Sequence, residues 1–412
     1  MSSSAPTSSN AQGKTVAAIV LVNFVTISGF GLMFPVYATF GNQIGASATE
    51  LAWAIAAFSF GQLLAAPVTG RLSDRFGRKL VLTISLLLGS VAYWLHGYVS
   101  SPEMLLVARF GSGLASGGFA VAFAVASDIS TRETRARVMG IVAAGFSAGL
   151  IFGPAIGGLV AGMVDESRAF ATVCHLSAAL NLLAALCTAT LLPETRRATT
   201  TASPQTDASA RGALLRNPAF YVPTLIGFAA MASIAMMEGT FVVYAQRILA
   251  LTPFQIGLMF AVMGTCSVTV QALAAGWLAR RLGEYRMLLL AMLVQAAGLL
   301  CLGSFAQLPM VVLGTVAISM GYALINPAAS ALASFAADEN TQGAAQGIVQ
   351  GAAAMGRVVG PASAGPVYDG FGPTAPFIVG GLQLIVIVAL ASLWRPREQR
   401  EIPGADAAPS LG

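Results

Sequence analysis

Long apolar stretches separated by short polar ones recur along the whole chain. Each runs for about 18 residues or more, the length at which a stretch indicates a membrane-spanning α-helix. The pattern predicts an all-α membrane protein with twelve transmembrane helices in two groups of six. In the first half we expect spans at 15–40, 50–70, 79–99, 104–126, 138–162 and 169–192. In the second half we expect spans at 219–246, 254–278, 286–305, 309–335, 344–367 and 373–394.

The polar stretches divide the chain into two bundles, a linker and two tails. Residues 15–192 and 219–394 are the predicted bundles, and 1–14 and 395–412 are the predicted cytoplasmic tails. Between the bundles, residues 193–218 are rich in Thr, Ser, Ala and Arg, a composition typical of a flexible linker. The first span follows a polar Ser-rich start and is too long for a signal-peptide core, so we expect it to be retained.

Composition excludes a water-exposed fold. Charged residues make up 9% of the 412 positions and hydrophobic residues 56%, whereas a soluble domain carries roughly 25% charged residues. The four cysteines all fall inside apolar runs, without a disulfide or metal-ligand spacing. No catalytic constellation of His, Cys or paired carboxylates is visible either. A transporter is therefore favoured over an enzyme, and no metal is expected.

The basic residues have a one-sided distribution. All but four of the 22 Lys and Arg residues lie in the termini, the linker or the loops after spans 2, 4 and 8. Arg109 and Arg357 lie within spans, and Arg168 and Arg247 lie on the opposite side. The positive-inside rule then predicts a bacterial inner-membrane protein with both termini in the cytoplasm. This bias accounts for the net charge of +5 without a nucleic-acid partner.

The two halves repeat one another. The motif Phe34-Pro-Val-Tyr-Ala38 matches Phe241-Val-Val-Tyr-Ala245 at an offset of 207 residues, and Gly153-Pro154 matches Gly360-Pro361 at the same offset. The chain is thus predicted to be two parallel six-helix repeats, an arrangement that places a substrate site between them near mid-membrane.

The loop after span 2, from Gly70 to Lys79, carries five charges between two helices. Its glycines permit a tight turn. Asp74 can accept charge-assisted hydrogen bonds from neighbouring arginines or from a helix N-terminus, and so can hold one arrangement of the bundles. The alternative interpretation is a topological stop signal.

The loop sequence resembles the signature of the major facilitator superfamily. Arg109-Phe-Gly-Ser-Gly113 in span 4 is similar to that family's membrane arginine. Span 5 resembles the signature of drug:proton antiporters, and its glycines at every fourth position permit close helix packing. The antiporter-type residues are Gly145, Gly149, Gly153, Pro154 and Gly157. The resemblance implies a conformational switch at Gly70, Asp74, Arg75, Gly77, Arg78 and Asp128.

Within the family, the chain looks like the twelve-span tetracycline-type efflux proteins, which share Gly31–Val36 and Gln342–Gly347. The resemblance implies proton-driven export of a hydrophobic or amphipathic compound, with no cofactor. A metabolite exporter or facilitator of the same superfamily is the alternative. Where tetracycline exporters carry membrane aspartates, this chain has Thr26, Ala92 and Gln295, which argues against tetracycline as the substrate. The expected partners are the substrate and the bilayer, with function as a monomer.

Of the 17 Asp and Glu residues, only Glu238 lies well inside a predicted span. A charge at the bilayer centre costs about 2.5–3.5 kcal/mol on insertion scales and marks a functional site by default. Glu238 is thus the predicted proton site, with Arg109 as a coupling partner. Glu238 could instead bind a cationic substrate or pair permanently with an arginine. Further candidates for the substrate cavity are Tyr37, Tyr244, Gln271, Gln295, Tyr322, Asn326 and Arg357.

Overall fold

The computed structural model describes residues 9–130, 134–195, 216–337 and 341–393, which form helices joined by short turns. The first half contains α1 (Ser9–Gly31), η1 (Phe34–Val36), α2 (Tyr37–Gln43), α3 (Ala48–Phe76), α4 (Arg78–His96), α5 (Pro102–Ala115), α6 (Gly118–Asp128), α7 (Arg135–Met163) and α8 (Glu166–Leu191). The second half contains α10 (Pro218–Arg247), α11 (Pro253–Leu273), α12 (Ala275–Leu282), α13 (Glu284–Ser304), α14 (Leu308–Phe335), α15 (Gln342–Phe371) and α16 (Ala375–Leu393).

Each of the twelve predicted spans coincides with one helix or with a run of consecutive short helices, which confirms the all-α fold class. Eleven stretches of the described residues are long and apolar enough to cross a membrane. The remaining predicted span corresponds to α15, whose 30 residues include Arg357 and many glycines. Helix α1 begins at Ser9, inside the predicted tail 1–14. The tail 395–412 and most of the linker 193–218 lie outside the described residues.

Three predicted spans are interrupted in the structure; the eighth, 254–278, is broken at Ala274, between α11 and α12. The first is broken between α1 and α2, where Pro35 lies at the start of η1 and lacks an amide hydrogen to continue the α-helical ladder. The fourth is broken at Ser116–Gly117, between α5 and α6. There the Thr69 hydroxyl donates a 2.9 Å hydrogen bond to the Gly117 carbonyl. Such side-chain bonds satisfy backbone groups freed by a break at membrane depth.

The internal repeat is visible in the packing of the helices. A Cβ atom built on Gly31 of α1 would lie 2.8 Å from Pro154 of α7, and one built on Gly239 of α10 would lie 3.1 Å from Pro361 of α15. The turns that follow α3 and α12 also correspond, because Gly77 and Gly283 both adopt positive φ angles, of 104° and 75°.

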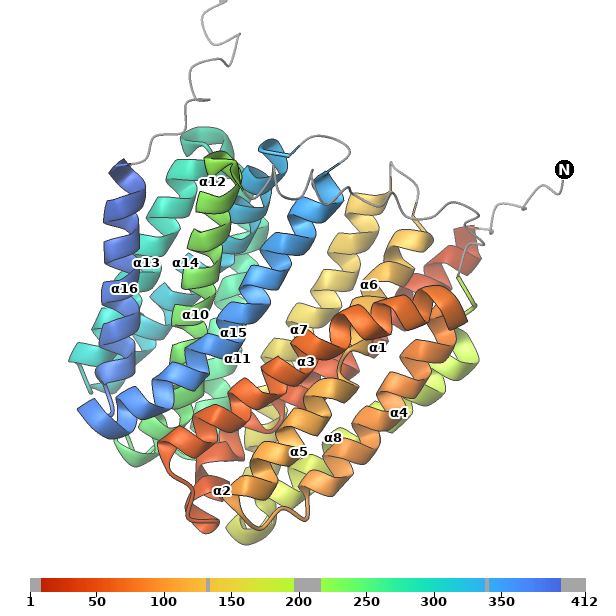
Figure 1. Cartoon of the computed structure of the whole chain (residues 1–412). Coiled ribbons are helices and arrows are strands. Elements are labelled where there is room, and N and C mark those ends of the chain that lie inside the picture. Colours follow the sequence, from red (N-terminus) through yellow and green to blue (C-terminus); the bar gives the residue numbers. More distant parts are fainter. Residues whose placement is uncertain (1–8, 131–133, 196–215, 338–340, 394–412) are drawn as a thin grey trace, which may run out of the picture.

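The six spans of each half pack into one bundle, and the two bundles meet along two helix pairs (Figure 1). Helix α7 packs on α11, and α3 packs on α15. We call the contact between the bundles the seam. The motif end of the molecule carries the loop Gly70–Lys79 and faces the top and right of Figure 1. The opposite end, which carries the turns after α2, α7, α10 and α15, is called the latch end.

Candidate substrate and coupling site

Glu238 lies in α10 between side chains that are almost fully buried. Met237 and Thr240 are both 0% exposed, whereas Glu238 itself is half-buried. The charge of Arg357 on α15 acts on Glu238 and on Tyr322 of α14. Among the described residues, however, no ion pair or hydrogen bond joins Glu238 to any group. The structure thus brings together three residues that the sequence nominated separately, and leaves the carboxylate unpaired.

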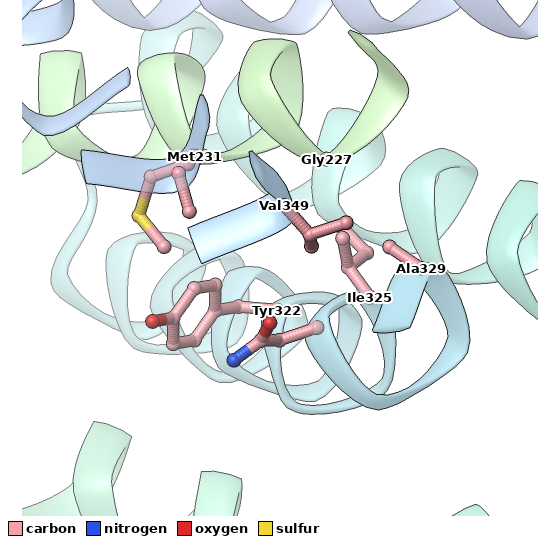
Figure 2. A pocket seen from close by; sticks show the side chains of 8 residues that line it. Gly227, Met231, Tyr322, Ile325, Ala329 and Val349 are labelled. Atoms are coloured by element: carbon pink, nitrogen blue, oxygen red, sulfur yellow. The ribbon is translucent and has the colours of Figure 1, made fainter. Parts of the chain in front are cut away.

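A pocket lies beside this cluster, between α10, α14 and α15. Figure 2 shows Met231 and Tyr322 extending toward one another from α10 and α14. Asn326, one helical turn after Tyr322, is exposed although it lies in a membrane-spanning helix. The lining residues are Gly227, Met231, Tyr322, Ile325, Asn326, Ala329, Val349 and Ala353. The pocket is therefore mainly apolar, with a phenol and an amide at its wall, and in this conformation it has room for about one water molecule.

Three other cavity candidates lie elsewhere. Gln295 is fully buried and donates a 3.1 Å hydrogen bond to the Ala230 carbonyl, so it joins α13 to α10 inside the bundle. Tyr244 is also fully buried, with its ring edge-on to Phe377 at 5.2 Å. Gln271 is exposed near the end of α11. In this conformation Gln295 and Tyr244 contribute to helix packing and not to the wall of the pocket.

Arg109, which was predicted to couple with Glu238, is surrounded by aromatic rings of the first bundle. It is 2% exposed in the first bundle, and its guanidinium carbon lies over the rings of Phe30, Tyr37 and Phe58. Its charge acts on Tyr37, Tyr93, His96 and Cys174, all in that bundle. Glu238 is influenced by Arg357 instead. The predicted coupling between Arg109 and Glu238 is therefore not a direct contact in this structure.

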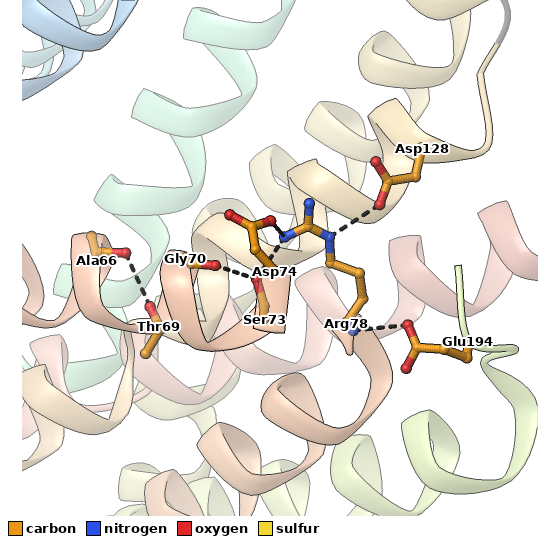
Figure 3. A network of polar contacts seen from close by, with 8 residues as sticks. All are labelled: Ala66, Thr69, Gly70, Ser73, Asp74, Arg78, Asp128 and Glu194. Carbon is orange, nitrogen blue, oxygen red and sulfur yellow. Dashed lines mark hydrogen bonds and ion pairs between the residues drawn. The ribbon is translucent and has the colours of Figure 1, made fainter. Parts of the chain in front are cut away.

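The loop after α3 forms a network around Arg78 (Figure 3). The Arg78 guanidinium pairs with Asp74 at 2.7 Å and with Asp128 of α6 at 3.0 Å, and donates to the Ser73 hydroxyl at 2.6 Å. The Arg78 amide also donates to the Glu194 carboxylate at 2.8 Å. The network links α3, α4, α6 and the segment after α8. In this conformation, each of these contacts of Asp74, Arg78 and Asp128 lies inside the first bundle.

Three other residues of this loop differ in their surroundings. Gly77 needs to be glycine, because its φ angle is 104° and the Glu194 carboxylate lies where a Cβ atom would be. Arg75 lies over the ring of Phe76, 5.3 Å from its centroid. Around Gly70, a Cβ atom would meet no heavy atom within 4 Å.

The glycines of the antiporter-type stripe pack α7 against α1. Cβ atoms built on Gly145, Gly149 and Gly153 would each lie 2.8 Å from a carbonyl oxygen of α1, and one on Gly157 would collide with the Leu32 carbonyl. Pro154 lies at the seam, because its carbonyl oxygen occupies the place of a Cβ atom on Gly257 of α11. The stripe thus sets the distance from α1 to a helix that also contacts the other bundle.

A group of polar contacts crosses the seam at the latch end. The Asp369 carboxylate of α15 accepts hydrogen bonds from the amide and the hydroxyl of Thr49, at 2.9 and 2.6 Å. The indole of Trp53 donates to the Ala362 carbonyl at 3.1 Å. Arg247 donates to the Asn42 side chain at 2.7 Å. The sequence analysis did not predict these contacts. The one unusual feature in the sequence was Arg247, a cation on the side opposite to most of the basic residues.

The sequence model of the Major Facilitator Superfamily matches residues 19–268 and 224–411. The chain therefore belongs to this superfamily of membrane transporters and is a multi-pass membrane protein, as the loop signature predicted.

Its relatives include drug resistance proteins. Multidrug resistance protein 2 of Bacillus subtilis (strain 168) is 28% identical over 392 residues, which cover 93% of this chain and 96% of that protein. The class C tetracycline resistance protein of Escherichia coli is 29% identical over 398 residues, 91% of this chain and 96% of the relative. The similarity to multidrug and tetracycline efflux proteins that the motifs implied is thus confirmed.

Solved structures share the fold. A bacterial homolog of the human lysosomal transporter Spinster, in an inward-facing and occupied conformation, has a TM-score of 0.78 at 14% identity and covers 95% of this chain and 100% of that one. The human organic anion transporter MFSD10 (TETRAN) has a TM-score of 0.66 at 23% identity, with 92% and 99% covered. At these identities the likeness concerns the fold alone.

Proposed function

We propose that this chain is a secondary active exporter of small hydrophobic or amphipathic, drug-like compounds, driven by exchange for protons. Resistance to multiple drugs and to tetracycline is what the names of its relatives describe, which supports the direction and the substrate class. The observation that carries the proton part is Glu238. It is an unpaired, half-buried carboxylate in a membrane-spanning helix, beside an apolar pocket.

Alternating access is the proposed mechanism. Contacts at the latch end hold the bundles together there. With the motif end placed in the cytoplasm by the positive-inside rule, this conformation is closed on the outer side, as an inward-facing state is. A compound then enters between the bundles from the cytoplasm and leaves on the other side when the latch end opens.

The protein is proposed to lie in the bacterial inner membrane, with both termini in the cytoplasm. The protein acts there as a monomer, with the proton gradient as its only energy source. Asp74, Arg78 and Asp128 serve the conformational switch, because their network joins α3, α4 and α6 near the motif end.

Transport in proteoliposomes under an imposed pH gradient tests the proposal, with ethidium as the probe. The wild-type protein should accumulate ethidium uphill, and an uncoupler should abolish this. Glu238→Gln, similar in shape but unable to titrate, should abolish uphill transport and retain downhill exchange. Glu238→Asp should keep partial activity with a shifted pH optimum. Glu103→Gln, an exposed acid at the start of α5, serves as the matched control.

Two outcomes would contradict the proposal. Full uphill transport by Glu238→Gln would remove Glu238 as the coupling site. Wild-type transport that only equalises ethidium, whatever the gradient, would indicate a facilitator in place of an antiporter.

A further inference from the structure

The guanidinium of Arg109 lies in a cage of aromatic rings contributed by three segments. Its central carbon is 5.6 Å from the ring centroid of Phe30, 5.3 Å from that of Tyr37 and 5.2 Å from that of Phe58. One of its amino groups is 3.7 Å from the sulfur of Met33, a weak acceptor. Cation–π contacts of this kind contribute about 0.5–2 kcal/mol each. The cage therefore holds the side chain in place but supplies no negative charge.

The Arg109 guanidinium has no ion pair among the described residues. Arg109 Nε is buried without a hydrogen-bond partner. The Tyr37 hydroxyl lies within hydrogen-bonding reach of the guanidinium, but a phenol is neutral and supplies no counter-charge. The charge of Arg109 acts on two phenols, an imidazole and a thiol, groups that carry no negative charge at neutral pH.

Burial of a charge without a partner costs several kcal/mol. A guanidinium presents five N–H donors in a planar fork that matches a carboxylate. What the cage lacks is thus a planar anion with two acceptor oxygens. Its rings, meanwhile, offer a stacking surface, which favours an aromatic group attached to that anion.

A row of rings connects the cage to the seam. Phe30 packs on Phe34 at 5.2 Å, and Phe34 packs on Phe260 of α11, in the other bundle, at 5.4 Å. Phe30 also stacks on Phe58 at 4.8 Å. Separation of the bundles would break the contact between Phe34 and Phe260 and uncover Phe30, which covers the guanidinium. The cage is closed in this conformation, and its link to the seam is the route by which separation of the bundles would open it.

We propose that the Arg109 cage binds the carboxylate of an aromatic acid, with Arg109 and Tyr37 donating to its oxygens and Phe30 and Phe58 stacking on its ring. This rests on the proposed export function and adds a substrate class to it: amphipathic aromatic carboxylates, including zwitterions. If the substrate is a zwitterion, its positive group would pair with the carboxylate of Glu238 in the other bundle.

Equilibrium binding to the purified full chain in nanodiscs tests the proposal without any gradient. The probes are 1-naphthoate and its uncharged analogue 1-naphthamide, with chloride alone as a third condition. The wild-type protein should bind naphthoate at least about tenfold more tightly than naphthamide. Arg109→Gln should abolish this preference, and Arg109→Lys should keep part of it. Arg168→Gln, an exposed cation on α8, should leave it unchanged.

Two further measurements separate binding from a structural role. Naphthoate should raise the unfolding temperature of the wild-type protein and leave that of Arg109→Gln unchanged, each compared with the same variant without ligand. Phe58→Leu should weaken naphthoate binding and leave binding of octanoate, an acid without a ring, intact.

Equal binding of naphthoate and naphthamide would overturn the proposal, as would unchanged naphthoate binding by Arg109→Gln. Competition by chloride as effective as that by naphthoate would overturn the aromatic part. The result is independent of the export proposal, because Glu238→Gln should lose uphill ethidium transport yet keep the preference for naphthoate.

Discussion

Asp369, two residues before the end of α15, gives the bundles a charged contact at the latch end. Its carboxylate accepts two hydrogen bonds from Thr49, which lies in the first turn of α3. Negative charge near a helix N-terminus is favourable, because the free amides and the helix dipole both point toward it. The contact should therefore stabilise the conformation in which the latch end is closed.

The size of the effect follows from the two bonds. A hydrogen bond to a charged group contributes about 1.5–3 kcal/mol, and competition with water at this exposed site reduces that range. We take about 2 kcal/mol for the pair, equivalent to a change of about 30-fold in the equilibrium between closed and open latch ends. Asp369→Ala should produce that shift. Asp369→Asn, which keeps a neutral acceptor, should produce about 5-fold, or about 1 kcal/mol.

Distances between spin labels on opposite sides of the seam measure this equilibrium. Met163 at the end of α7 and Phe305 after α13 are exposed at the latch end and suit labelling in a variant without the four cysteines. Asp165→Ala, an exposed acid at the same end, is the control. An unchanged distance distribution for Asp369→Ala, equal to that of Asp165→Ala, would refute the idea that Asp369 closes this end.

Other expected outcomes concern packing, switching and topology. Gly149→Ala should lower the free energy of unfolding by about 1–3 kcal/mol, because the added Cβ atom would press on an α1 carbonyl. Gly162→Ala should leave it unchanged, because the added Cβ atom would meet open space. Thermal unfolding compares the two variants. Asp74→Asn weakens the ion pair with Arg78, so transport turnover should fall while substrate affinity stays nearly constant. A cysteine placed in the linker 193–218 should react with an impermeant reagent only from the cytoplasmic side.

Much of the fold could be predicted from the sequence because apolar runs of bilayer length allow few alternatives. The predicted spans and the observed helices agree to within a few residues at most ends, as for α10 (Pro218–Arg247 against 219–246). The breaks after Leu32, at Ser116–Gly117 and at Ala274 were not predicted. Hydropathy does not change at a break, and the compensating contact comes from Thr69 on another helix.

The candidate site was predictable only where membrane depth makes a residue exceptional. Glu238 and Arg357 stood out because charges are costly there, and they do lie close together. Polarity alone did not reveal which face of a helix a residue occupies, so Gln295 was taken for a cavity residue although it joins α13 to α10. Asp369 and Thr49 were missed because polar residues at span ends are common.

The setting of Arg357 limits how Glu238 can be regulated. Gly356 and Gly360 flank Arg357, and Cβ atoms on either would collide with the backbone of α10, the helix that carries Glu238. Gly239 makes a similarly close approach to Pro361. The two helices are too closely packed for Arg357 to approach or leave Glu238 by sliding. The charges therefore move together with the second bundle, and what changes between conformations is the access of water and substrate to Glu238.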